Sequence, residues 1–237
     1  LQQVRSEFRK LETSAIEEAP LSMQLVGWDP LIMAEAAKFC EGLGATFIDI
    51  NMGCPSKKVT GKYSGSALML NTKLAASIMK AVKSAVTVPV TLKMRLGWDY
   101  SCMNATKLSR IAEDCGLSMI VVHGRTRCQK FSGQADWMKI ASVVDEVSIP
   151  VIANGDIKCV DTAAKAISTS AATGVMVGRG AQGRPWILGQ IGDLLAGREV
   201  RADPSVRQRH FLIRSHLDDM ITYYGNEAMK LARKHIA

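Results

Sequence analysis

The sequence lacks a hydrophobic run long enough to cross a bilayer. None approaches the roughly 18 consecutive apolar residues that a membrane-spanning helix needs, so we expect no membrane segment. It also lacks paired-cysteine motifs, because its six cysteines show neither CxxC spacing nor a Cys/His zinc pattern. This distribution argues against a disulfide scaffold and against a metal site, and it predicts a reduced, cytoplasmic protein.

Acidic residues are in short supply. The 237 residues include 30 Lys and Arg against 22 Asp and Glu, which gives a formal net charge of +8. The excess is spread over the chain rather than gathered in a basic tail, and it hints at a polyanionic partner without requiring one. With 47% hydrophobic residues, a chain of this length suits one large domain, or one domain with a small appendage.

Short apolar runs alternate with longer amphipathic segments. The runs, which we predict to be strands, are 21–26, 46–50, 90–94, 119–123, 151–154 and 174–177. The amphipathic segments, which we predict to be helices, are 30–41, 72–84, 105–115, 136–145 and 161–167. This alternation predicts a parallel sheet with helical crossovers. The even spacing, and the lack of a GxGxxG motif after the first strand, favour a (β/α)8 TIM barrel over a doubly wound sheet.

The last two predicted strands each end in a small glycine turn. The two turns are Asn154-Gly155-Asp156 and Gly178-Arg179-Gly180. In barrels that bind a phosphorylated ligand, the phosphate commonly lies on the loops after strands 7 and 8. On this interpretation the chain holds strands 3–8, strands 1 and 2 are missing, and Leu1 is a cut rather than a native start. Each turn taken alone is more simply an ordinary βα connection, but the pairing of two such turns on consecutive strands favours the phosphate site.

The pattern changes after Pro185-Trp186. Residues 204–224 predict a long amphipathic helix, and residues 227–236 predict another that follows Gly225. We therefore expect a barrel domain over 1–186, incomplete at its start. A small all-α domain is expected over 187–237, incomplete at its end.

The longest loop follows the predicted strand 46–50 and contains Cys54 between a glycine and a proline. Long βα loops at the carboxyl end of a barrel are where catalytic residues gather. A thiol held there can serve as an acid or a nucleophile. The alternative is a small buried residue in a tight turn, which is how most lone cysteines behave.

Polar side chains also share the inward face of the predicted strands. Lys93 alternates with apolar residues in 90–94, so it needs an anionic or electron-rich partner, either a flavin edge or a neighbouring acid. Gln24 is a second polar group aimed at the same place. His123 lies at the end of its predicted strand. It is either a contact of a bound ligand or a histidine whose hydrogen bonds are made within the protein. Arg125 in the next loop contacts phosphate or is a solvated charge.

Together these segments resemble the tRNA-dihydrouridine synthases, in their bacterial B-type branch. The motifs are DINMGCPSKKV at 49–59, KMRLG at 93–97, HGRT at 123–126, NGDI at 154–157 and GRGAQGRPW at 178–186. The likeness runs from about Met23 to the end of the chain. The family's Pro-Met-Ala flavin-binding segment has no counterpart here, which agrees with the two strands expected to be missing.

The resemblance implies an FMN-bearing barrel with a helical domain that helps to hold tRNA, acting as a monomer. NADPH or NADH would reduce the flavin, a hydride would pass to C6 of a uracil in tRNA, and Cys54 would protonate C5. The implied FMN contacts are Gln24, Lys93, His123, Asn154, Gly155, Asp156, Gly178 and Arg179. The implied contacts of the substrate uracil and its neighbours are Asn51, Arg125 and Thr126.

Two other functions fit parts of this pattern. One is an FMN barrel oxidoreductase that acts on a free dihydropyrimidine or a dihydroorotate-like molecule. Lys57, Lys58 and Lys62 on the Cys54 loop argue against it, because they suit a polyanion better. The other is an RNA-binding remnant whose flavin site has decayed, although binding alone requires neither Cys54 nor Lys93.

Overall fold

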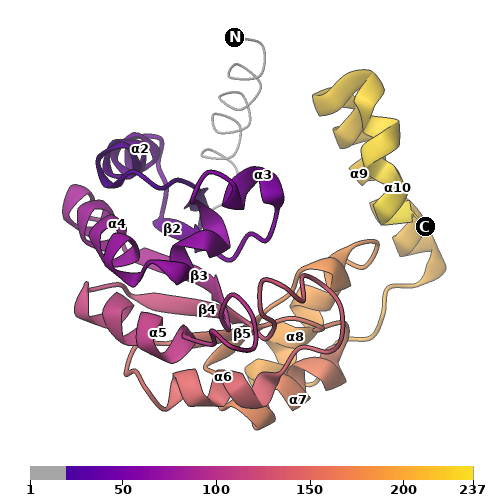
Figure 1. Ribbon diagram of the computed structural model, residues 1–237. Helices are drawn as coiled ribbons and strands as arrows, with labels where there is room; N and C mark the ends of the chain where they lie inside the picture. Colours follow the sequence, from indigo (N-terminus) through magenta and orange to yellow (C-terminus); the bar gives the residue numbers. More distant parts are fainter. Residues whose placement is uncertain (1–19, 237) are drawn as a thin grey trace.

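A parallel sheet of six strands forms the centre of the protein in the computed structural model, which describes residues 20–236 (Figure 1). The strands are β1 (Ser22–Leu25), β2 (Phe47–Met52), β3 (Val90–Arg95), β4 (Met119–His123), β5 (Val151–Asn154) and β6 (Gly174–Met176). Each strand pairs with the next one along the chain, so the order in space equals the order in sequence. A doubly wound sheet reverses its order part-way, whereas this order is that of a barrel wall.

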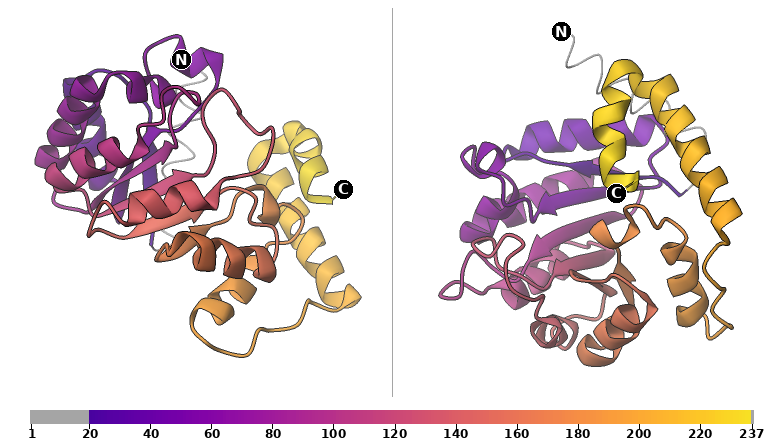
Figure 2. Two further views of the ribbon diagram at one scale, coloured as in Figure 1. Left: turned by 60° about the horizontal axis from the view of Figure 1, so that its bottom comes forward. Right: turned by 90° about the vertical axis from the view of Figure 1, so that its right-hand side faces the viewer.

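Helices link the strands and cover one face of the sheet. They are α2 (Pro30–Gly42), α4 (Thr72–Ala85), α5 (Ala105–Asp114), α6 (Trp137–Val144), α7 (Val160–Ser170) and α8 (Ile187–Leu195). α2 contacts α4, and from α4 to α8 each helix contacts the next, so they form a continuous outer layer (Figure 2). Three short helical turns are α3 (Lys57–Thr60) and η1 (Gly65–Leu70), both after β2, and η2 (Arg179–Ala181), after β6.

The hydrophobic core lies between the sheet and this helical layer. In β3, Val90, Leu92 and Met94 are fully buried in the core, whereas Thr91 and Lys93 line a cavity on the opposite face. Successive side chains of a strand point to opposite faces, so one strand serves both the core and the cavity. Burial of a side chain such as Leu92 contributes about 1.5–3 kcal/mol of hydrophobic stabilisation.

Two glutamates at the ends of helices fix the turns from which later strands start. The Glu41 carboxylate in α2 accepts hydrogen bonds from the Thr87 hydroxyl at 2.7 Å and from the backbone N–H groups of Thr87 and Val88 at 2.8 and 3.0 Å. These bonds lower the pKa of Glu41. Glu113 in α5 accepts the Ser148 N–H at 2.7 Å in the same way. Because these turns precede β3 and β5, the same arrangement sets the start of both strands.

The chain ends in a helical hairpin. It consists of α9 (Val206–Tyr224), the short η3 (Gly225–Glu227) and α10 (Ala228–Ile236), and it stands beside the sheet domain (Figure 1). Met220, Ala228 and Ala232 form its small core. None of the helices in the described part of the chain combines the length and apolarity needed to cross a membrane.

The predicted α/β fold is confirmed. Each predicted strand is present, and its observed ends lie within two residues of the predicted ones. A helix was expected after the turn 178–180 without a predicted range, and α8 follows that turn and packs on α7, with Ile187 and Ile191 buried beside Ile157. The division of the chain at residue 186 and the numbering of the strands as 3–8 stay predictions.

Candidate active site

A cavity of about 750 Å³ lies on the face of the sheet opposite the helices, and all six strands contribute side chains to it. Of the twelve residues predicted for the site, ten line this cavity: Gln24, Asn51, Cys54, Lys93, His123, Asn154, Gly155, Asp156, Gly178 and Arg179. Arg125 and Thr126 do not line it. Gln24 and Arg179 are 155 positions apart in sequence, yet both line this cavity. They meet there because parallel strands end at the same edge of the sheet.

Cys54 lies in the turn after β2, and its side chain is only partly buried. The Asn51 Oδ1 atom accepts the backbone N–H groups of Gly53 at 3.0 Å and of Cys54 at 2.9 Å. On the other side, the Cys54 carbonyl accepts the Ser66 hydroxyl at 2.8 Å. Gly65 has a φ of +60°, and a Cβ there would lie 3.0 Å from the Cys54 carbonyl oxygen, so this close approach requires glycine. The turn is therefore held from both sides.

A hydrogen-bonded network, the Asp49 network, connects β3, β2 and β1 to this turn. The Thr91 hydroxyl donates to Asp49 Oδ1 at 2.6 Å, and Gln24 Nε2 donates to Asp49 Oδ2 at 2.6 Å. Asn51 Nδ2 then donates to Gln24 Oε1 at 2.7 Å. Burial raises the pKa of Asp49, against the opposing effects of Gln24, Thr91 and the charge of Lys93. Asp49 was absent from the predicted site, although strand alternation places it on the same face as Asn51.

Lys93 lies in the interior of the cavity. Its Nζ donates to Asn154 Oδ1 at 3.3 Å, and Asn154 Nδ2 in turn donates to the Met176 carbonyl at 2.8 Å. Burial and the neighbouring Arg95 lower the pKa of Lys93, while the charge of Asp49 raises it. Lys93 was expected to meet either a flavin edge or a neighbouring acid. Within the described part of the chain, no carboxylate forms an ion pair with Lys93. An amine in this setting favours an anionic ligand.

Arg95 joins the Cys54 turn to the long loop after β4, although it was not predicted as a site residue. Its guanidinium is buried and donates to the Gly53 carbonyl at 2.7 Å, and to the carbonyls of Thr126 and Lys130 at 2.9 Å each. Burial and the charge of Arg125 lower its pKa to about 10. The planar fork of arginine suits this role, because one side chain can hold several carbonyls of two loops.

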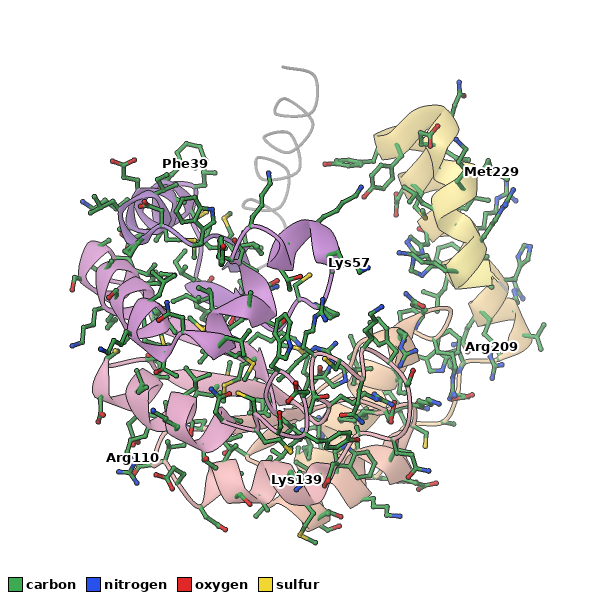
Figure 3. The ribbon with its side chains drawn as sticks, viewed as in Figure 1. Phe39, Lys57, Arg110, Lys139, Arg209 and Met229 are labelled. Atoms are coloured by element: carbon green, nitrogen blue, oxygen red, sulfur yellow. The ribbon has the colours of Figure 1, made fainter. Side chains whose placement is uncertain are left out.

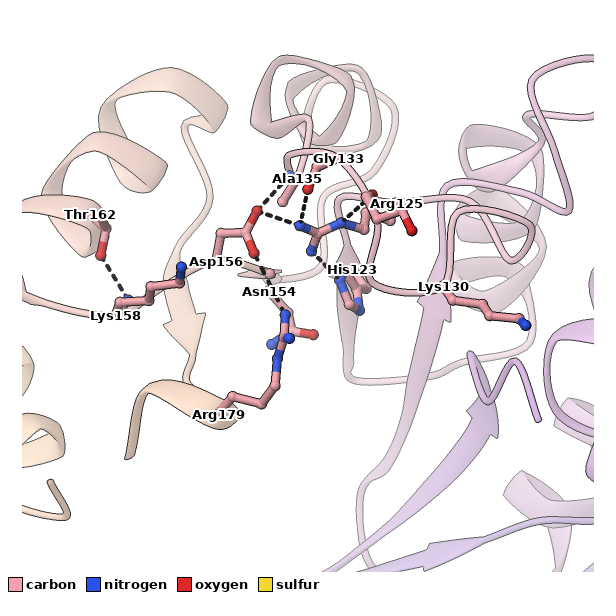
Figure 4. Close-up of polar contacts among 12 residues, drawn as sticks. His123, Arg125, Lys130, Gly133, Ala135, Asn154, Asp156, Lys158, Thr162 and Arg179 are labelled. Carbon is pink, nitrogen blue, oxygen red and sulfur yellow. Dashed lines mark hydrogen bonds and ion pairs between the residues drawn. The ribbon is translucent and has the colours of Figure 1, made fainter. Parts of the chain in front are cut away.

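Arg125 is buried and holds the loop after β4 through several hydrogen bonds (Figure 4). It donates to Asp156 Oδ2 at 2.6 Å, to the Gly133 carbonyl at 2.6 Å and to the Ser132 carbonyl at 3.1 Å. Thr126 is also fully buried, and its backbone N–H donates to a glutamine side chain within the same loop. The expectation that Arg125 is a solvated loop charge is therefore wrong. The substrate roles of Arg125 and Thr126 stay predictions.

The ring of His123 is neutral, and its tautomer follows from its neighbour. Arg125 Nη1 lies 3.3 Å from His123 Nε2. Arginine has only donors, so Nε2 accepts and the ring proton is on Nδ1. Burial, followed by the charges of Arg95 and Lys93, lowers the pKa of His123 to about 3. His123 thus adds no positive charge to the cavity at neutral pH.

The turns after β5 and β6 also line the cavity. Asp156 accepts the Ala135 N–H at 2.8 Å, and its other oxygen lies 3.8 Å from Arg179 Nη2 (Figure 4). The Arg179 guanidinium lies over the Phe131 ring, 4.7 Å from its centroid. Phe131 comes from a loop that carries no strand or helix periodicity, so the sequence held no signal for its place here.

Within residues 20–236, no group of three or more His, Cys, Asp and Glu side chains is arranged to hold a metal ion.

Comparison with known proteins places the chain in a family. The family model described as "Dihydrouridine synthase (Dus)" matches residues 1–237. The chain belongs to the dihydrouridine synthase family. The "Probable tRNA-dihydrouridine synthase" of Rickettsia conorii is 49% identical over 232 residues, which are 96% of this chain and 70% of that relative. The "tRNA-dihydrouridine synthase B" of Xanthomonas axonopodis pv. citri is 45% identical over 221 residues, 93% of this chain and 67% of the relative. The family resemblance predicted from the motifs is confirmed.

Similar solved structures support the fold of this dihydrouridine synthase family member. A mandelate oxidase has a TM-score of 0.53 at 21% identity, covering 78% of this chain and 59% of that protein. A mandelate racemase/muconate lactonizing family protein from Azoarcus sp. EbN1 has a TM-score of 0.53 at 21% identity, covering 80% of this chain and 45% of that protein. At this identity the likeness concerns the fold alone.

Proposed function

We propose that this protein is a flavin-dependent oxidoreductase that reduces the C5–C6 double bond of uridines in tRNA, with FMN as its flavin and NADPH or NADH as its reductant. The observation that carries the proposal is the cavity. Its lining includes a partly buried thiol, Cys54, and an interior amine, Lys93, in a chain of the dihydrouridine synthase family.

The lining of the cavity fits a phosphorylated flavin. The lining holds more basic than acidic side chains. The basic ones are Lys93, Arg95, Lys158 and Arg179, and the acidic ones are Asp49 and Asp156. The volume lies in the range of about 300–1,000 Å³ that is typical of sites for small molecules. The residues proposed to hold FMN are Gln24, Lys93, His123, Asn154, Gly155, Asp156, Gly178 and Arg179. When bound, FMN supplies the hydride that C6 of the uracil receives.

Cys54 is proposed as the acid. Reduction of the uracil ring adds a hydride at C6 and a proton at C5, so one acid is needed at one defined point. The Cys54 turn is held by Asn51 and Ser66, which restricts where the thiol hydrogen can point. After the proton leaves, the thiolate regains a proton from solvent, since the side chain is only partly buried. Asn51 directly, and Arg125 and Thr126 through the loop that they hold, are proposed to position the uracil and its neighbours.

The partner is proposed to be tRNA. A uracil inside folded tRNA must leave its stack to enter such a cavity, which requires the protein to hold the surrounding backbone. Lys57 and Lys58, both exposed on α3, supply positive charge next to the Cys54 turn, and Lys57 lies on the side that faces the α9–α10 hairpin (Figure 3). The hairpin adds basic residues such as Arg209. We further propose a cytoplasmic monomer, with the six strands as strands 3–8 of an eight-stranded barrel and residues 187–237 as part of a tRNA-binding domain.

The test is the formation of dihydrouridine in an unmodified tRNA transcript, in the presence of FMN and NADPH, measured by mass spectrometry of the nucleosides. We expect product with the wild-type chain. Cys54→Ala should lower the rate by about 10²-fold or more, because a positioned acid contributes about 10²–10⁴-fold. Cys128→Ala, at an exposed cysteine of the loop after β4, is the matched control and should keep the wild-type rate.

Three results would contradict the proposal. One is equal rates for Cys54→Ala and the wild type. Another is turnover of free dihydroorotate or dihydrouracil with none on tRNA, which would support the small-molecule alternative. The third is salt-dependent tRNA binding by a protein without flavin absorbance or turnover, which would support an RNA-binding remnant.

A further inference from the structure

The Asp49 network begins at two buried side chains, Thr91 and Asp49, to which the proposed chemistry gives no role. Thr91 and Asp49 are buried at the inner face of the sheet, whereas Gln24 is exposed. The network continues through Asn51 to the backbone N–H groups of Gly53 and Cys54. It therefore connects a buried carboxylate of β2 with the turn that carries the thiol, by way of two side-chain amides.

The direction of every hydrogen bond in this network is set by its two ends. Both carboxyl oxygens of Asp49 accept, Oδ1 from Thr91 and Oδ2 from Gln24, so Gln24 must present its Nε2 to Asp49 and its Oε1 to Asn51. Backbone N–H groups only donate, so Asn51 must present its Oδ1 to the turn and its Nδ2 to Gln24. The two requirements agree at the contact between the amides, where Asn51 Nδ2 donates to Gln24 Oε1 at 2.7 Å. A flipped amide at either position would place two donors or two acceptors against each other.

We propose that Asp49 is a positioning residue for the thiol: through Gln24 and Asn51 it holds both amides in one orientation and thereby orders the Cys54 turn. The importance of that turn for turnover rests on the proposed function of Cys54. The ordering itself does not, because every atom in the network belongs to this chain.

A different role for Asp49 is to balance the charge of Lys93, and two substitutions separate the roles. In Asp49→Asn the charge is lost, but the new Oδ1 still accepts from Gln24 and the new Nδ2 can donate to the Thr91 hydroxyl, which is also an acceptor. In Asp49→Leu both the charge and the hydrogen bonds are lost. A charge-balancing role predicts the same effect for both variants, whereas the positioning role predicts an effect of Asp49→Leu that Asp49→Asn rescues.

The experiment is hydrogen exchange of the Gly53 and Cys54 amides in the full chain, followed by NMR. Loss of one hydrogen bond corresponds to about a tenfold change in an equilibrium, so Asp49→Leu should speed exchange at both amides by about tenfold or more. Asp49→Asn should stay within about threefold of the wild type. The Ile120 amide, which donates to the Pro150 carbonyl at 2.9 Å in the sheet, reports on global folding and should be unchanged in both variants.

Unchanged exchange at Gly53 and Cys54 in Asp49→Leu would overturn the proposal, as would equal acceleration in both variants. If Asp49→Leu does not fold, Gln24→Met breaks the same connection at an exposed side chain and should give the same acceleration. The measurement needs neither flavin nor tRNA. A chain that shows the expected exchange but forms no dihydrouridine would therefore refute the proposed function alone, and the converse result would refute the positioning role alone.

Discussion

His123 should make the stability of this protein strongly dependent on pH. The residue is 8% exposed, and it lies near the charges of Arg95, Lys93 and Arg125. Burial and these cations lower its pKa from 6.5 to about 3. When the pH falls below 6.5, the unfolded chain binds a proton at this histidine and the folded chain does not. The free energy of unfolding therefore has its full value, as far as His123 is concerned, above a pH of about 6.5. It decreases progressively as the pH falls towards 3.

The size of this effect follows from the difference between the two pKa values. One pKa unit corresponds to about 1.4 kcal/mol, so the full difference amounts to about 5 kcal/mol. Between pH values of about 7.5 and 5.0, the unfolded state gains about 2 kcal/mol relative to the folded state from this residue alone. A loss of that size is a large fraction of the roughly 5–15 kcal/mol by which domains are stable.

The assay is urea unfolding of the wild type and of His123→Gln at both pH values. Glutamine does not titrate, and its Oε1 can accept from Arg125 as the ring nitrogen does. Other titrating groups contribute equally to both proteins, so the difference between the two pH dependences isolates His123. We expect the wild type to lose about 2 kcal/mol more than the variant on acidification. A difference below about 0.5 kcal/mol would show that the ring is protonated near its ordinary pKa, and that Arg125 does not hold it neutral.

Three further predictions concern packing and loop geometry. Leu92→Ala should destabilise the fold by about 2–5 kcal/mol in urea unfolding, because Leu92 is fully buried between sheet and helices; a loss below about 1 kcal/mol would contradict this packing. Gly155→Ala should cost about 1–3 kcal/mol by thermal unfolding, since Gly155 has a φ of +111° and a Cβ would lie 2.9 Å from His123 Cδ2; an unchanged melting temperature would contradict it. Arg95→Lys keeps the charge but not the fork, so hydrogen exchange should quicken in the loop after β4 while Ile120 stays protected; unchanged exchange at Lys130 would refute the role of the fork.

The strands and the cavity face could be predicted because both depend on short-range periodicity. Alternation within 90–94 placed Lys93 on the inner face, and the cavity lining confirms that position. Gln24, which was predicted to face the same place as Lys93, lines the same cavity. The same rule applied to β2 would have placed Asp49 on the inner face, although Asp49 was predicted only as part of an apolar run and of the motif 49–59.

The remaining features depend on contacts between residues far apart in sequence. Arg125 follows a strand end like any loop charge, and only the fold shows that its guanidinium is enclosed by Gly133 and Asp156. Asp49 meets Gln24 across 25 positions and Thr91 across 42. Local sequence determined which side chains face inward, because the period of a strand is a property of its own backbone. The tertiary structure decided which of them meet, because hydrogen bonds with fixed donors and acceptors depend on the register and curvature of neighbouring strands.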